Sequence, residues 1–173
     1  MGTITLRAAG PADVPALAKL GRDSFVAKFG PLYRPEDLAA FLDASHSEAV
    51  VAREVNDPRM RVMLAVRDGT FAGFCKLVLA PGWPEHARGR SPMELKQLYT
   101  APEATGGGVG GALVEWALVT ARAEGCDEIQ LSVWAGNDGA QRFYRRYGFE
   151  KIADIEFWVG TQRDDEYLFA LRL

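Results

Sequence analysis

The order of the predicted elements indicates an α/β fold with a mixed central sheet of about seven strands. Three observations lead to this prediction. Strand-like alternation at the N-terminus is followed by a long helical stretch, and only then by two strands around Asp68-Gly69, a strong hairpin signal. The second half alternates strand and helix before two closing strands, which argues against βαβ units alone. No repeat, low-complexity tract or linker divides the 173 residues, so we expect a single domain over 1–173.

Each element follows from a local pattern. Pro11-Ala-Asp13 marks a helix start, Gly30-Pro31 a stop, and Gly148 a C-terminal helix cap. The predicted strands cover 3–7, 61–67, 71–78, 94–100, 129–133, 152–159 and 166–173. The predicted helices cover 11–29, a segment opening at 35, 47–55, 109–124 and 137–147, and the proline-rich stretch 80–92 is expected to be a loop.

Composition excludes several classes of function. Hydrophobic residues make up 48% and charged residues 25%, as in ordinary globular proteins, and the net charge of −3 argues against a nucleic-acid surface. No apolar run could span a membrane, and no apolar signal region opens the chain, so we expect a cytoplasmic protein with no membrane partner. The two cysteines, Cys75 and Cys126, have no metal-ligand spacing, so we expect reduced thiols and no metal site.

A glycine-rich loop is the strongest functional signal. Five glycines stand among the six residues 106–111, between an apolar strand and an apolar helix. Backbone N–H groups can approach an anion closely there, and the helix start adds positive potential, which indicates a phosphate cradle. The G-x-G-x-x-G pattern also fits a dinucleotide site, but the strand 129–133 runs into Trp134 without the acid such a site needs. A coenzyme A pyrophosphate and a plain flexible loop remain open.

A second motif is more specific. Asn137, Ala140, Phe143, Tyr144 and Gly148-Phe149 keep fixed spacing after a strand. Together with Gln97-Leu-Tyr-Thr and the glycine loop, this segment resembles the GCN5-related N-acetyltransferase (GNAT) family. The resemblance implies the GNAT fold, with helices on both faces of the sheet, and acetyl-CoA as cofactor.

The resemblance also implies roles for individual residues. Tyr144 is implied as the general acid, since a phenol of pKa ~10 can protonate a thiolate of pKa ~8.5. A backbone N–H near Leu98 or Tyr99 is the expected oxyanion donor. Thr105 departs from the family pattern, which has Arg or Gln there. The expected cofactor-binding residues are Leu98, Tyr99, Thr100, Thr105, Gly106, Gly107, Gly108, Val109, Gly110, Gly111, Asn137, Ala140, Phe143 and Tyr144.

The amine acceptor must also lose a proton. Strand alternation places Glu94 on the same side as Lys96, Leu98 and Thr100. Glu94 could act as a base through water, or it could be a solvated charge at a strand edge; the sequence leaves both open.

The N-terminal half resembles bacterial spermidine/spermine-type (PaiA-like) acetyltransferases, on Phe29-Gly-Pro-Leu-Tyr33 and Glu36-Asp37-Leu. This implies a small-molecule amine substrate, with a polyamine as one candidate, bound by Phe29, Tyr33, Glu36 and Trp134. Glu36 and Asp37 could instead simply favour a helix start. A protein N-terminus as acceptor, or a non-catalytic acyl-CoA-binding module, are the alternatives. The sequence leaves the oligomeric state open: such folds often dimerise, and the C-terminal strands could mediate a homodimer.

Overall fold

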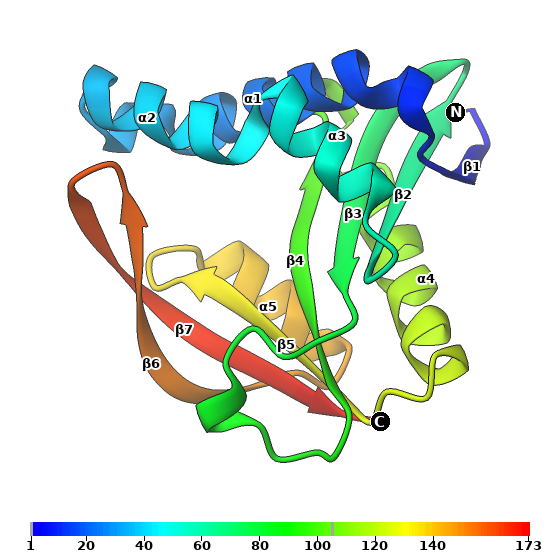
Figure 1. Cartoon of the computed structure of the whole chain (residues 1–173), viewed down its shortest axis with the longest axis vertical. Helices are drawn as coiled ribbons and strands as arrows, with labels where there is room; N and C mark the ends of the chain where they lie inside the picture. The colour runs from blue at the N-terminus through cyan, green and yellow to red at the C-terminus, as the bar shows by residue number, and fades with distance from the viewer. Residues whose placement is uncertain (1, 105) are drawn as a thin grey trace.

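The chain folds as a twisted seven-stranded sheet with helices on both faces (Figure 1). A computed structural model describes residues 2–104 and 106–173. The strands are β1 (Ile4–Ala8), β2 (Met60–Arg67), β3 (Thr70–Val78), β4 (Pro92–Thr100), β5 (Glu128–Trp134), β6 (Glu150–Val159) and β7 (Gln162–Arg172). The helices are α1 (Val14–Phe29), α2 (Pro35–His46), α3 (Glu48–Asn56), α4 (Val109–Ala123) and α5 (Asp138–Arg146).

One pair of neighbouring strands near the centre of the sheet differs from all the others. The strands run β1-β2-β3-β4-β5-β7-β6, and every neighbouring pair is antiparallel except β4 with β5. That parallel pairing comprises only Pro92 with Glu128, Met93 with Ile129 and Glu94 with Gln130. Beyond these residues the two strands diverge (Figure 1), so the backbone edge of β4 after Glu94 has no strand partner on the β5 side.

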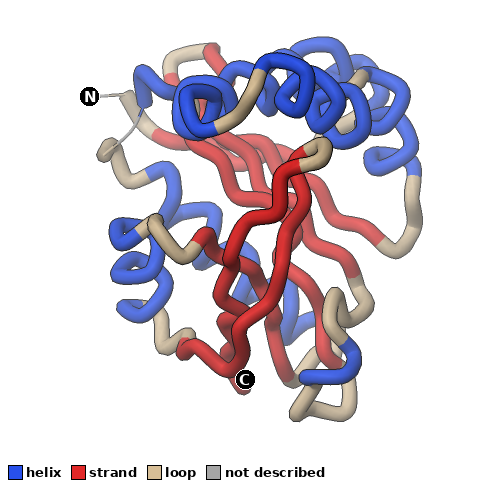
Figure 2. Tube along the Cα trace, turned by 90° about the vertical axis from the view of Figure 1, so that its left-hand side faces the viewer, coloured by secondary structure: helices blue, strands red, loops and turns tan. Residues whose placement is uncertain are grey.

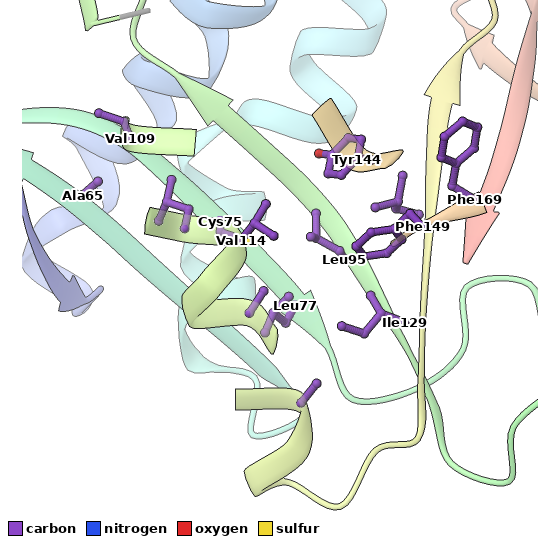
Figure 3. Close-up of a cluster of buried hydrophobic side chains, with 14 of the residues drawn as sticks. Ala65, Cys75, Leu77, Leu95, Val109, Val114, Ile129, Tyr144, Phe149 and Phe169 are labelled. Carbon is purple, nitrogen blue, oxygen red and sulfur yellow. The ribbon is translucent and has the colours of Figure 1, made fainter. Parts of the chain in front are cut away.

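Among the described residues, three buried clusters hold the helices; two lie on opposite faces of the sheet, and the third joins α1 and α2 to β6 through Phe25, Phe41, Leu42 and Val159. On one face, Val14 and Leu17 of α1 and Val51 of α3 pack on Leu64 and Phe74. The larger core on the other face unites α4 and α5 with the sheet; the side chains drawn in Figure 3 belong to it. Figure 2 shows α1–α3 crossing one end of the sheet as a roof. The predicted mixed sheet with helices on both faces is therefore confirmed.

Local signals account for the helix that follows the glycine loop. Gly108 is the N-cap of α4 and has φ 85, a left-handed conformation that glycine adopts without strain. Leu113, Ala117 and Ala121 then recur every four residues and are fully buried on the core face. The helix is anchored by this apolar stripe, and its N-terminal N–H groups begin at the loop.

A bulge in β4 contradicts the simple alternation expected from sequence. The β3–β4 register shifts at Lys76/Leu77, so Lys96 is an extra residue without a paired partner. Lys96 bonds Glu54 of α3 at 3.1 Å, whereas Leu98 packs in the core on the opposite face. The expectation that Glu94, Lys96 and Leu98 share one side was therefore wrong at Leu98.

The last strand begins earlier than predicted. β7 starts at Gln162 rather than at 166, because Gly160 (φ 57) and Thr161 form a tight hairpin with β6. Asp37 of α2 accepts hydrogen bonds from the Thr161 N–H at 2.8 Å and its hydroxyl at 2.9 Å, which fixes the turn. The polar run at the start of β7 has low strand propensity, so sequence alone indicated a loop there.

Among the described residues, the helices are all too short or too polar to cross a lipid bilayer.

Candidate active site

A cavity of about 800 Å³ occupies the gap where β4 and β5 diverge. It is lined from both faces of the sheet, because the missing β4–β5 pairing opens a passage between them. Most of the predicted cofactor-binding residues meet here. Those that line the cavity are Leu98, Tyr99, Thr100, Gly106, Gly108, Val109, Gly110, Gly111, Asn137, Ala140, Phe143 and Tyr144. Gly107 lies in the same loop outside the lining, and Thr105 lies outside the described residues.

The glycines of the loop serve two distinct purposes. Gly106 (φ 82) and Gly108 (φ 85) adopt backbone conformations that L side chains rarely take. Gly110 and Gly111 permit close packing instead: an added Cβ would lie 3.3 Å from Cζ of Phe143 at Gly110 and 2.9 Å from the Tyr147 hydroxyl oxygen at Gly111. The free N–H groups of the α4 N-terminus therefore reach the cavity without intervening side chains, which suits an anionic group such as a phosphate.

Asn137 has a structural role that its sequence motif did not reveal. Its side-chain oxygen accepts a hydrogen bond from the Ala140 N–H at 3.1 Å and so caps α5. Asn137 also lines the cavity. The cap uses the amide oxygen, and no group in the described ranges accepts from the amide NH₂, which is therefore available to a ligand.

Tyr144 presents a protonated phenol to the cavity. Its ring packs edge-on against Phe143 and Phe149, and the residue is 8% exposed. Figure 3 shows its hydroxyl pointing away from Phe149 and Phe169. Within the described chain no side chain or backbone group hydrogen-bonds this hydroxyl. Burial raises its pKa above the usual value for a phenol, so the group keeps its proton at neutral pH.

Glu94 lines the cavity on the face that carries α1. Burial raises the pKa of its carboxyl, and the nearby Lys96 partly opposes this effect. The loop after β3 covers it: a Cβ on Gly82 would lie 2.8 Å from the Glu94 carboxyl carbon. Gln130 of β5 ties this loop down, because its amide accepts from the Trp83 N–H at 3.0 Å and donates to the Trp83 carbonyl at 2.9 Å.

A second carboxyl in the cavity, Glu166 of β7, was missed from the sequence. Glu166 is 9% exposed and lies in register with Trp134. Burial, and then the charge of Asp164, raise its pKa to about 7, while a hydrogen bond from Ser132 opposes them. The signal was present: Asp164, Glu166 and Leu168 alternate as buried positions on one face of β7. Placing the strand start at 166 hid that pattern.

Aromatic side chains form the wall of the cavity beneath α1 and α2. Phe29, Tyr33 and Trp134 all line it as predicted, and the Phe29 and Trp134 rings meet edge to face at 6.3 Å. The Tyr33 hydroxyl donates to the carboxylate of Asp164. An aromatic wall beside the carboxyl group of Glu166 favours a cationic guest.

Glu36 is not brought to this cavity. It is exposed at the start of α2, with its carboxylate 3.7 Å from the guanidinium of Arg34. Asp37 beside it is buried, and its oxygens are occupied by Thr161 and Arg34. Both acids therefore lie where they favour the first turn of α2 and fasten the β6–β7 hairpin.

Comparisons with known proteins point in one direction. Residues 22–149 match the acetyltransferase (GNAT) family. An uncharacterised N-acetyltransferase of Mycobacterium tuberculosis is 32% identical over 93% of this chain and 98% of its own length. One from Lactobacillus delbrueckii is 27% identical over 90% of each chain. The crystal structure of the PaiA N-acetyltransferase of Thermoplasma acidophilum with coenzyme A superposes with a TM-score of 0.81 at 20% identity, covering 99% of both chains.

Proposed function

The chain belongs to the acetyltransferase (GNAT) family, and on that premise we propose that it transfers an acetyl group from acetyl-CoA to a primary amine of a small molecule. The amine attacks directly, within a ternary complex, and residues 1–173 act as one catalytic domain. The observation that carries the proposal is the cavity at the divergence of β4 and β5. It joins an anion cradle on one side to carboxyl groups and an aromatic wall on the other.

The cradle fits the phosphates of coenzyme A. Gly106, Gly108 and the start of α4 line the cavity with backbone and no Cβ in the way, and the helix start attracts negative charge. Asn137 keeps its amide NH₂ free toward the same space. When bound, acetyl-CoA supplies an acetyl group activated as a thioester.

The residues of the chain then have separate tasks. The unpaired edge of β4 near Leu98 and Tyr99 offers backbone N–H groups to negative charge that develops on the acetyl oxygen. Tyr144 donates a proton to the departing sulfur. The acceptor must arrive as, or become, a neutral amine. Glu94 and Glu166 both line the cavity with raised pKa values, and each is proposed as a base that takes its proton.

The carboxyl groups favour an acceptor with more than one amine, and a polyamine is our specific candidate. Glu94 and Glu166 line the cavity beside the aromatic wall that contains Phe29. Asp164 is not part of the described lining, and its oxygens accept hydrogen bonds from Tyr33 and Gln162. The lining carboxyl groups and the aromatic wall can hold a second ammonium group and pack a methylene chain while the reacting amine loses its proton.

The test is thiol release from acetyl-CoA by the full chain against polyamines, amino sugars, amino acids and peptides with free N-termini. We expect turnover with small amines and the highest kcat/KM for polyamines. Turnover only with peptides would replace the small-molecule acceptor by a protein N-terminus. Tight acetyl-CoA binding without turnover of any acceptor would instead indicate a non-catalytic binding module.

A further inference from the structure

The β2–β3 hairpin reaches the glycine loop through Arg67, the last residue of β2. Its guanidinium Nη2 donates to the carbonyl oxygen of Gly107 at 3.0 Å. The same group occupies the space where a side chain would start: a Cβ on Gly107 would lie 2.1 Å from Nη2 and 2.8 Å from the guanidinium carbon. The guanidinium therefore takes the position that a side chain of residue 107 would need, which is possible because residue 107 is glycine.

The bond to Gly107 fixes the direction of the next N–H group. In a trans peptide the carbonyl of one residue and the N–H of the next point in opposite directions. Because Arg67 holds the Gly107 carbonyl, the Gly108 N–H points to the other side of the loop. Gly108 lines the cavity, whereas Gly107 and Arg67 are not part of its wall as described.

Arg67 also lowers the folding stability in a way that a purely structural hydrogen bond to Gly107 does not explain. Its Nε is buried and has no hydrogen-bond partner in the described part of the chain. None of the acidic side chains of that part forms an ion pair with it. Arg67 as a whole is half-buried, but a buried N–H without a partner lowers stability, and this cost lies directly behind the anion cradle.

We propose that Arg67 is a positioning residue for the phosphate cradle. It sets the Gly107–Gly108 peptide so that the Gly108 N–H faces the cavity before a ligand arrives, and it adds fixed positive charge behind the loop. It does not touch the ligand itself. The inference rests on the proposed function, because it assumes that coenzyme A phosphates occupy the cradle.

The test compares binding of CoA with binding of pantetheine, which lacks the pyrophosphate, by titration calorimetry on the full chain. Removing a charge-assisted hydrogen bond should weaken CoA binding roughly tenfold in Arg67→Met, with pantetheine binding unchanged. Arg67→Lys should be intermediate, since it keeps the charge without the planar group. Arg61→Met is the matched control: Arg61 lies on the same strand and bonds Glu124 at 2.9 Å, and its loss should leave both affinities unchanged.

A double-mutant cycle separates positioning from a general effect on folding. Gly107→Ala should displace the guanidinium and weaken CoA binding about as much as Arg67→Met. In the Arg67→Met background the same alanine should cost little more, because the space is vacated. Hydrogen exchange at the Gly108 amide in the free protein should accelerate in Arg67→Met, which reports loop order without any ligand.

The outcomes distinguish this inference from the proposed function. Unchanged CoA affinity in Arg67→Met, or an equal loss of pantetheine affinity, overturns the role of Arg67 alone. A wild-type chain that binds no CoA overturns the proposed function and this inference with it. Additive losses in the cycle would likewise refute a shared action of Arg67 and Gly107.

Discussion

At the scale of single residues, burial and not sequence position gives the titrating groups of the cavity their properties. Tyr144 and Glu166 are almost fully enclosed, and burial is the first cause of the raised pKa of each. The consequence is a phenol that remains protonated in the same cavity as a carboxyl that ionises near neutral pH. A proton donor and a proton acceptor can therefore coexist in one cavity at the same pH.

Tyr144→Phe tests the donor. We expect kcat to fall by about 10²- to 10⁴-fold, because the departing sulfur loses its proton source, while the affinity for acetyl-CoA stays nearly constant. Steady-state kinetics and calorimetry measure the two quantities. Tyr167→Phe is the control, since Tyr167 packs at the margin of the same core and does not line the cavity in the described structure. Equal turnover in both variants would remove Tyr144 from the chemistry.

The pH dependence of kcat/KM tests the two acceptor carboxyls. A base works only when ionised, so kcat/KM should rise as pH increases through a pKa of about 7 if Glu166 is the base. Glu166→Gln should then abolish that rise. If Glu94 is the base instead, Glu94→Gln should be the variant that changes the profile, because burial raises the pKa of Glu94 as well. A variant whose profile keeps the wild-type shape is not the base.

The pH dependence of folding stability gives a second test of Glu166. Stability should fall as pH rises, whereas kcat/KM should rise. Its raised pKa means that the folded state binds more protons than the unfolded state between about pH 4.5 and 7. Folding stability contributed by this group is therefore lost as pH rises through that window. Glu166→Gln should raise the free energy of unfolding by roughly 1–3 kcal/mol at pH 8 and change it little at pH 4. Urea melts at the two pH values measure this.

At the scale of elements, the N-termini of α4 and α5 position ligand-binding residues at the cavity. The N-terminus of α4 is set by Gly108, and that of α5 by the side chain of Asn137. Both helices start at the cavity, so the residues that begin them have structural and ligand-binding tasks at once. Sequence motifs found these residues but did not separate the two tasks.

Substitutions at Asn137 separate them. Asn137→Ala should lower the free energy of unfolding by about 1 kcal/mol through the lost cap and should also weaken CoA binding. Asn137→Ser should restore the cap without the amide NH₂ group. Full recovery of stability with persistent loss of CoA affinity would assign the amide to the ligand. If Asn137→Ser recovers both, the residue acts only as a cap. Asn56→Ala, at the end of α3, serves as the control.

At the scale of the whole molecule, a partly buried charge cluster connects the helical roof to the bulge in β4. Glu54 of α3 bonds Lys76 of β3 at 2.7 Å and Lys96 of β4 at 3.1 Å. Lys76 is 1% exposed and Lys96 is the bulged residue, so the cluster fixes the point where β4 changes face. Leu98 and Tyr99 follow directly after this bulge in β4.

Glu54→Gln should therefore be strongly destabilising. It leaves the buried Lys76 ammonium with no counter-charge, and breaking a buried pair in this way costs roughly 3–5 kcal/mol. Chemical denaturation of Glu54→Gln beside Glu48→Gln, an exposed acid on the same helix, measures the difference. A loss no larger than in Glu48→Gln would show that the cluster contributes little to the fold.

Much of this architecture could be predicted from the chain, for physical reasons. Element types followed from periodicity, and the Asp68-Gly69 turn and the glycine loop from residues with few alternative conformations. The bulge at Lys96 could not be predicted, because it depends on a partner far away in the sequence, Glu54 of α3. Glu166 was missed because its neighbours on β7 are polar, and Glu36 was assigned to a cavity that α2 turns it away from.

The brief pairing of β4 with β5 has a further consequence for solubility. A sheet normally exposes its unpaired backbone only at its two outer strands, but here the divergence creates an additional pair of strand edges inside the molecule. Other chains cannot reach these inner edges from the side that the roof of α1 and α2 covers (Figure 2). In a variant that loses this roof, the inner edges of β4 and β5 would be open to pairing with strands of other molecules. We expect such a variant to aggregate before it loses its remaining secondary structure.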